Sequence, residues 1–150
     1  MKKILNDPNA YVDEMLDGLC MAHPELQRRG DGGRVVCRAG GAVSGKVGIV
    51  TGGGSGHLPV FLGYVGEGLL DSCAVGNVCA GPRMDDCMEA MRAADGGAGV
   101  LQLYGNYGGD RMNFEMAAEM LALDGMDIAS VRVSDDVACA PMAQRGKRRG

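Results

Sequence analysis

The chain has 150 residues, the length of one ordinary domain. Hydrophobic residues make up 46% and charged residues 23%, which is enough apolar material for a core and argues against intrinsic disorder. A net charge of -4 and only 4% aromatic residues argue against a nucleic-acid-binding protein, and no apolar run reaches the roughly 20 residues of a membrane span.

The first half of the chain reads as helices and strands separated by glycine-rich loops. A cap and Pro8 precede apolar residues at helical spacing, which predicts a helix that ends near His23. Further on we predict strand 35–37 between loops, buried strand 46–51, short helix 60–65 and a strand within 70–78.

The second half repeats this alternation more clearly. We predict a helix from Pro82 that stops at the Gly96-Gly97 pair, and then strand 99–104. A helix over 111–123 and strand 128–133 follow. Most of the 11 methionines lie at helical spacing, and we expect them in the core, including the stripe Met112, Met116, Met120 and Leu123.

Six cysteines and no apolar export segment at the first residues predict free, mostly buried thiols in a reducing compartment. No Cys-x-x-Cys pair occurs, so we expect no zinc site. The protein is therefore predicted to be cytoplasmic.

Strands that alternate with helices of ten to fifteen residues predict an α/β fold, with a mostly parallel sheet and helices on both faces. We expect residues 1–150 to form a single α/β domain. Binding crevices of such sheets lie at the carboxyl ends of the strands. Three predicted strand exits are rich in glycine and polar residues: 52–57, 105–110 and 134–136.

The loop Gly52-Gly53-Gly54-Ser55-Gly56-His57 matches neither the P-loop nor the dinucleotide fingerprint, so a nucleotide site is not supported. Its glycine N–H groups could approach the oxygen atoms of a ligand. The alternative is a tight turn that needs positive φ angles.

His57 follows this loop directly and is a candidate proton acceptor or hydroxyl-orienting group, whereas His23 reads as a helix-end residue. Asp110 could cap a helix, accept a proton from a substrate hydroxyl, or do both. Asn106 could bind a substrate hydroxyl or form an Asx turn. Asp135-Asp136 reads better as a solvated strand end than as a metal site.

Together these loops resemble the substrate-binding K subunit of the dihydroxyacetone kinase family, over nearly the whole chain and in the family's order. The resemblance rests on segments 2–8, 52–57, 96–101, 106–110 and 135–137.

The resemblance implies phosphorylation of a terminal hydroxyl of a small hydroxyketone. By analogy, His57 would orient or deprotonate a hydroxyl and Asp110 would be the base for the attacking hydroxyl. The substrate-binding residues would be Gly54, Ser55, Gly56, His57, Asn106 and Asp110. The resemblance implies no cofactor in this chain: ATP-Mg or a phosphoryl-carrier partner belongs to a separate nucleotide-binding kinase domain or subunit. It also implies a homodimer.

Two departures from the family bear on the substrate. Gly105 stands where many members have Lys before the Asn-Tyr pair, and Leu58 stands where the common motif has Glu. The change at Gly105 favours a four-carbon ketose such as erythrulose as an alternative to dihydroxyacetone.

The family's second histidine, which holds the ketone carbonyl covalently, and its second domain have no counterpart here. We therefore expect an amino-terminal part of the subunit with little activity alone. A truncated, catalytically inactive paralogue that acts as a binding or regulatory module, and a phosphosugar-binding α/β domain, remain the alternatives.

Overall fold

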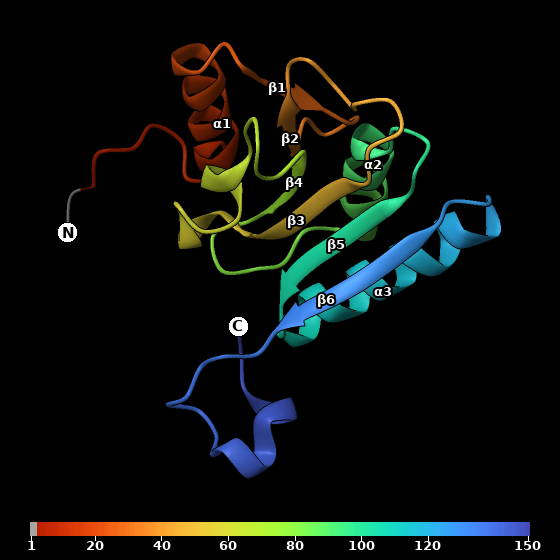
Figure 1. Cartoon of the computed structure of the whole chain (residues 1–150). Helices are drawn as coiled ribbons and strands as arrows, with labels where there is room; N and C mark the ends of the chain where they lie inside the picture. The colour runs from red at the N-terminus through yellow and green to blue at the C-terminus, as the bar shows by residue number, and fades with distance from the viewer. Residues whose placement is uncertain (1–2) are drawn as a thin grey trace.

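A six-stranded sheet with helices against both faces forms the body of the molecule in the computed structural model, which describes residues 3–150 (Figure 1). The strand order is β1-β2-β4-β3-β5-β6. Strands β4, β3, β5 and β6 run parallel; β2 pairs antiparallel with β4, and β1 pairs antiparallel with β2 at the edge of the sheet. The predicted fold class is confirmed.

The strands are β1 Leu26–Arg29, β2 Val35–Arg38, β3 Gly48–Gly54, β4 Ser72–Gly76, β5 Val100–Gly105 and β6 Ile128–Val133. The α-helices are α1 Tyr11–Ala22, α2 Met84–Ala94 and α3 Gly108–Leu123, and 3-10 turns cover Ser55–His57, Leu62–Tyr64 and Met142–Lys147.

Two elements differ from the predictions. Strand β1 was not predicted, because its sequence Leu-Gln-Arg-Arg is polar, as an edge strand allows. The short helix expected over 60–65 is a single 3-10 turn at Leu62–Tyr64. Lys2, in the family-like segment 2–8, lies outside the described residues.

The two faces of the sheet are covered by different elements. Helices α2 and α3 pack on one face, where Tyr104 of β5 stacks on Phe114 of α3 with ring centroids 4.7 Å apart. Helix α1 and the segment 61–70 pack on the other face, over β2 and β4, and bury Leu16 and Val36 completely. These two clusters hold the sheet between them.

The methionine stripe of α3 does not face the core. Met112, Met116 and Met120 are exposed, and the buried side of the helix consists of Phe114, Ala117 and Leu121. Helix α3 has two apolar sides. The side that carries Phe114, whose ring stacks on Tyr104, packs on β5. The expectation that these methionines are core residues was wrong.

Strand β3 lies at the centre of the parallel part of the sheet, between β4 and β5. Their carboxyl ends are therefore neighbours at one edge, whereas the end of β6 lies beyond β5. Within residues 3–150, no helix combines the length and apolar character needed to cross a bilayer.

Candidate functional site

A cavity of about 300 Å³ lies at the carboxyl edge of the sheet, where β3, β4 and β5 end. We call it the His57–Asp110 cavity, because it brings together the two candidate catalytic residues from separate strand exits. Its lining residues are Gly54, His57, Phe61, Cys79, Ala80, Gly81, Tyr107, Gly109 and Asp110.

Gly52, Gly53 and Gly54 belong to β3 and Gly56 lies in the 3-10 turn that follows, so the predicted tight turn with positive φ angles is wrong. The strand continues to Gly54, and none of these glycines has a positive φ angle. A Cβ at Gly52 would lie 2.7 Å from the Ala74 carbonyl oxygen, and a Cβ at Gly56 would lie 2.7 Å from that of Val78. Close packing against neighbouring backbone therefore favours glycine at these two positions.

His57 closes the 3-10 turn after β3 and is exposed on one side of the cavity. Its ring centroid lies 5.9 Å from that of Phe61, edge to face, and 6.0 Å from that of Tyr107. The described residues give its side chain no hydrogen bond, so two aromatic rings hold the imidazole while its nitrogens stay available to a ligand.

Asp110 lies in the first turn of α3, with its carboxylate buried. The helix begins at Gly108 and Tyr107 occupies the cap position, so the expected capping role for Asp110 is wrong. Its Oδ1 atom has no hydrogen-bond partner among the described residues and lies against Gly81, where any Cβ would collide with it. Only glycine at position 81 leaves space for this carboxylate.

Burial raises the pKa of Asp110 to about 6, and the nearby His57 opposes this shift. The carboxyl group is therefore ionised at neutral pH but close enough to neutrality to bind a proton readily. A buried carboxylate with an unpartnered oxygen that faces a cavity is typical of a functional rather than a structural group.

The other predicted substrate residues do not line this cavity. The Asn106 side-chain amide donates to the carbonyl oxygens of Gly146, at 3.1 Å, and Arg148, at 2.7 Å, so it holds the C-terminal segment. The Gly56 amide donates to Val78 at 2.7 Å. The Ser55 hydroxyl is buried without a partner among residues 3–150, away from the cavity wall.

The third predicted strand exit, 134–136, also lies apart from the cavity. Asp136 accepts a hydrogen bond from the Ala138 amide and donates its own amide to the Arg149 carbonyl oxygen, so it orders the C-terminal segment. In the part of the chain that the structure describes, no group of three or more His, Cys, Asp or Glu side chains could hold a metal ion.

The sequence reading missed the contribution of the β4 exit. Cys79, Ala80 and Gly81 form one wall of the cavity, and Phe61 and Tyr107 complete it. The signal was present in Gly76 and in the Gly81-Pro82 pair that separates a strand from a helix. These glycines could not be assigned to the site from the sequence, because the sequence does not show that β4 lies beside β3.

This arrangement suits a small polar molecule with hydroxyl groups. The cavity offers one buried proton acceptor and one imidazole. Three of its lining residues, Gly54, Gly81 and Gly109, add no side chain to its wall. A hydroxyl held between carboxylate and imidazole can be deprotonated as it attacks an electrophile.

Comparison with curated proteins finds relatives along the full chain. A dihydroxyacetone-binding subunit of a PTS-dependent dihydroxyacetone kinase from Listeria innocua is 44% identical, and the match covers 100% of this chain and 45% of that protein. A D-erythrulose kinase from Mycolicibacterium smegmatis is 43% identical over 100% of this chain and 26% of its own length. The chain thus spans less than half the length of these relatives.

Solved structures agree with this similarity. The native dihydroxyacetone kinase of C. freundii superposes with a TM-score of 0.89 at 33% identity, over 99% of this chain and 28% of that one. A dihydroxyacetone kinase operon co-activator superposes with a TM-score of 0.78 at 29% identity, over 83% of this chain and 38% of its own. The Dak1 domain profile matches residues 17–150. The resemblance in the sequence is confirmed, and the chain belongs to the Dak1 domain family.

Proposed function

We propose that this chain forms the ketose-binding part of a dihydroxyacetone-type kinase, which transfers a phosphoryl group to the terminal hydroxyl of a small hydroxyketone. The observation that carries the proposal is that His57 and Asp110, from two strand exits, line one cavity of about 300 Å³. The names of relatives, a dihydroxyacetone-binding subunit and an erythrulose kinase, supply the substrate class.

The proposed roles follow from the site geometry. The substrate's terminal hydroxyl lies beside Asp110, and its oxygen attacks the phosphorus of the donor while its proton passes to the carboxylate. The bond from phosphorus to the donor's leaving oxygen breaks, and the electron pair stays on that oxygen. His57 orients a second hydroxyl, and Gly54 lets the ligand approach the end of β3.

The substrate is a three- or four-carbon ketose. The names of relatives include a D-erythrulose kinase, which supports erythrulose as an alternative to dihydroxyacetone. Ser55, Gly56 and Asn106 are not proposed as direct ligands, because they lie outside the cavity wall.

The phosphoryl donor belongs to another part of the complete kinase in this proposal. ATP with Mg²⁺, or a phosphoryl-carrier protein, would be bound by a separate domain or subunit, and the ketose-binding subunit would form a homodimer. We place the protein in the cytoplasm, because all six cysteines are free, as a reducing compartment requires.

The ketose site is tested by titrating the 150-residue chain with ligand and monitoring its amide NMR signals. Dihydroxyacetone and erythrulose should shift the amide signals of Gly54, His57 and Gly109 saturably. His57→Ala and Asp110→Ala should abolish these shifts. His23→Ala removes the other histidine, which is exposed after α1, and should leave them unchanged.

Two outcomes would contradict the proposal. Ketose-induced shifts that survive both cavity variants would place the ligand elsewhere. Preferential binding of dihydroxyacetone phosphate over dihydroxyacetone would instead favour the phosphosugar-binding alternative.

A regulatory ligand-binding module is the second candidate function, and the similarity to an operon co-activator favours it. Both functions predict ketose binding, so turnover separates them. A complete protein that carries this domain should consume ATP or a phosphorylated carrier with dihydroxyacetone if it is a kinase. Ketose binding with no phosphorylated product under either donor would favour the regulatory module.

A further inference from the structure

One cysteine, Cys79, lines the His57–Asp110 cavity. All six thiols are free, and Cys79 and Cys139 are the two exposed ones. Burial raises the pKa of the other four thiols, Cys20, Cys37, Cys73 and Cys87. Because the thiolate is the nucleophilic form of cysteine, we expect thiol reactions at neutral pH mainly at Cys79 and Cys139.

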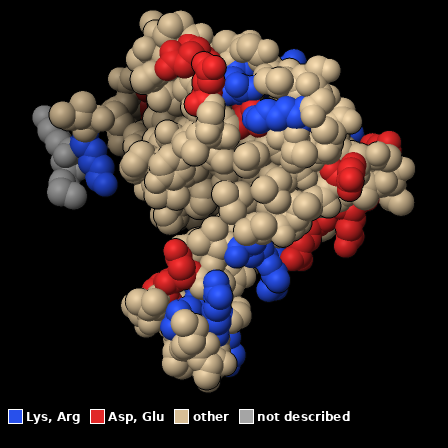
Figure 2. Space-filling view, in the orientation of Figure 1, with Lys and Arg blue, Asp and Glu red and all other residues tan. Residues whose placement is uncertain are grey.

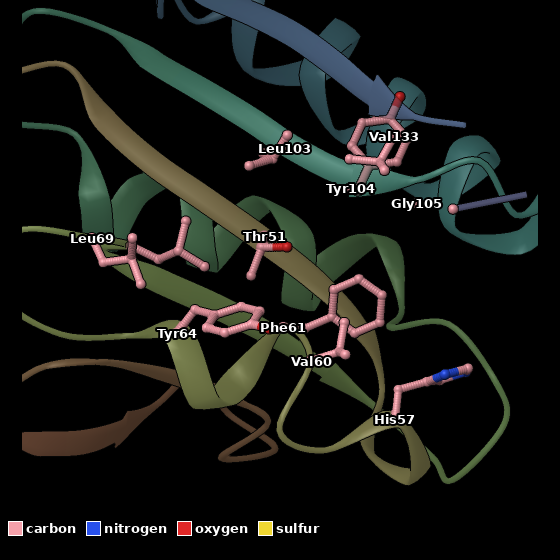
Figure 3. A pocket seen from close by; sticks show the side chains of 12 residues that line it. Thr51, His57, Val60, Phe61, Tyr64, Leu69, Leu103, Tyr104, Gly105 and Val133 are labelled. Carbon is pink, nitrogen blue, oxygen red and sulfur yellow. The ribbon is translucent and has the colours of Figure 1, made fainter. Parts of the chain in front are cut away.

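The loop that carries Cys79 is held against the turn that carries His57. The Gly56 amide donates to the carbonyl oxygen of Val78, the residue before Cys79, at 2.7 Å. Figure 3 shows the imidazole of His57 with the green loop between β4 and α2 passing beside it. Cys79 belongs to this loop, so the backbone contact fixes the thiol in the wall of the cavity.

Asp110 gives the same cavity a negative charge. The residue is 6% exposed, and its Oδ1 atom has no hydrogen-bond partner among the described residues. Within residues 3–150, no Lys or Arg lines the cavity. A buried carboxylate without a partner is stabilised by a cationic donor, so the cavity favours an ammonium group and disfavours an anion.

Cys139 lies in surroundings of the opposite charge. It belongs to the C-terminal segment 134–150, which holds more Lys and Arg than Asp. Figure 2 shows these positive side chains, in blue, gathered at the bottom of the molecule. The Arg149 amide donates to the Cys139 sulfur at 3.2 Å. The chain therefore contains a second exposed thiol that serves as a natural control for Cys79.

From these observations we infer that Cys79 is a site of reversible thiolation by small disulfides that carry an ammonium group, such as cystamine. The attached aminothiol arm lies in the cavity, with its ammonium beside the Asp110 carboxylate. The inference goes beyond the proposed function, because the charge preference of the thiol does not depend on ketose binding.

The reaction is a thiol–disulfide exchange. The Cys79 thiol loses its proton to solvent, and the thiolate attacks one sulfur of the disulfide. A new S–S bond forms, the original S–S bond breaks, and its electron pair leaves on the released aminothiol. Cys79 is oxidised and the released half of the disulfide is reduced, so a free thiol reverses the modification.

The attached arm takes up space beside Asp110 in a cavity of about 300 Å³. Thiolation of Cys79 therefore excludes a second occupant from the same carboxylate. Mutual exclusion of thiolation and ketose binding rests on the proposed function, whereas the thiolation site itself does not.

Two disulfides of similar size and opposite charge test this inference without any ketose. The 150-residue chain is treated at pH 7.5 with cystamine, or with dithiodipropionic acid, whose arms end in carboxylates. Peptide mapping by mass spectrometry gives the rate at each cysteine. Each rate is divided by the rate of the same disulfide with free N-acetylcysteinamide, which corrects for the reactivity of the reagent.

At Cys79 we expect cystamine to react at least about tenfold faster than dithiodipropionate, because the Asp110 charge attracts one arm and repels the other. At Cys139 we expect no preference for cystamine, since its neighbours are positive. Asp110→Asn removes the charge and keeps the shape, so the preference at Cys79 should fall at least about fivefold. Asp124→Asn, which changes an exposed carboxylate paired with Arg92, is the matched control and should leave it unchanged.

Three outcomes would overturn the inference: equal corrected rates of the two disulfides at Cys79, a preference that persists in Asp110→Asn, and no reaction at Cys79 while Cys139 reacts. A chain that shows the preference but binds no dihydroxyacetone in the NMR titration would support the thiolation site and contradict the proposed function.

Discussion

Two buried carboxylates show how this fold separates a structural group from a functional one. Asp71 is 3% exposed and receives Lys46 Nζ at 2.8 Å, Arg38 Nη2 at 2.9 Å and the Ile49 amide at 2.8 Å. Asp110 is equally enclosed, yet its Oδ1 has no partner among the described residues.

The difference shows what each group can do. Both carboxylate oxygens of Asp71 have partners, so this carboxylate ties the start of β4 to β2 and β3. Asp110 keeps an oxygen for a ligand, and its raised pKa records the cost of holding that charge without a partner.

The largest expected effect is on Asp71. Asp71→Asn breaks a buried ion pair and leaves Arg38 without its carboxylate, so we expect a loss of about 4 kcal/mol in the free energy of unfolding. Urea denaturation of the 150-residue chain measures it. The control Asp124→Asn alters an exposed pair with Arg92 and should cost less than about 0.5 kcal/mol.

The second effect concerns catalysis by Asp110. In a complete kinase that carries this domain, Asp110→Asn should reduce kcat at least about a hundredfold, because an amide cannot accept the hydroxyl proton. Circular dichroism should show an unchanged fold. A variant with the wild-type kcat would remove Asp110 as the base, and Asp124→Asn is again the matched control.

The third effect has the opposite sign from that at Asp71. The folded-state pKa of Asp110, about 6, lies above its ordinary value of 3.8, so the native state loses stability as pH rises from about 4 through 6. Asp110→Asn should therefore stabilise the chain at pH 7.5, by about 1 kcal/mol once solvent screening through the open cavity is allowed for. Thermal unfolding at pH 3.5 and pH 7.5 checks that the gain disappears at low pH. A gain that is equal at both values would contradict the assigned pKa.

The smallest effect concerns how His57 is held. Hydrogen bonds fix Asp71, whereas ring contacts from Phe61 and Tyr107 fix His57. Phe61→Leu should weaken ketose binding about fivefold, measured by the NMR titration, since one ring contact contributes about 1 kcal/mol. Tyr64→Leu, in the same segment but away from the cavity, should leave the affinity unchanged.

The sequence was sufficient for most elements, although not for the polar edge strand β1 or for the turn at Leu62–Tyr64. It was also sufficient for the pairing of His57 with Asp110, because both follow buried strands and parallel strands end at one edge. It was insufficient for strand order. The exit 134–136 follows β6, which lies outside β5, so the β4 exit with Gly81 takes its place beside β3. No pattern along the chain records which strands become neighbours.

The sequence also could not show which side of α3 faces the core. The methionine stripe and the stripe of Phe114, Ala117 and Leu121 have equal helical spacing, and only the stacking of Phe114 on Tyr104 decides between them. The predictions of one domain, a homodimer and a separate donor subunit stay predictions.

The most direct test of the shared cavity is a carbon-13 NMR titration of the Asp110 carboxyl group in the 150-residue chain. We predict a pKa of about 6 that rises in His57→Ala, since the imidazole lowers it, and that stays unchanged in His23→Ala. An ordinary carboxyl pKa that does not respond to His57→Ala would show that imidazole and carboxylate do not share a site.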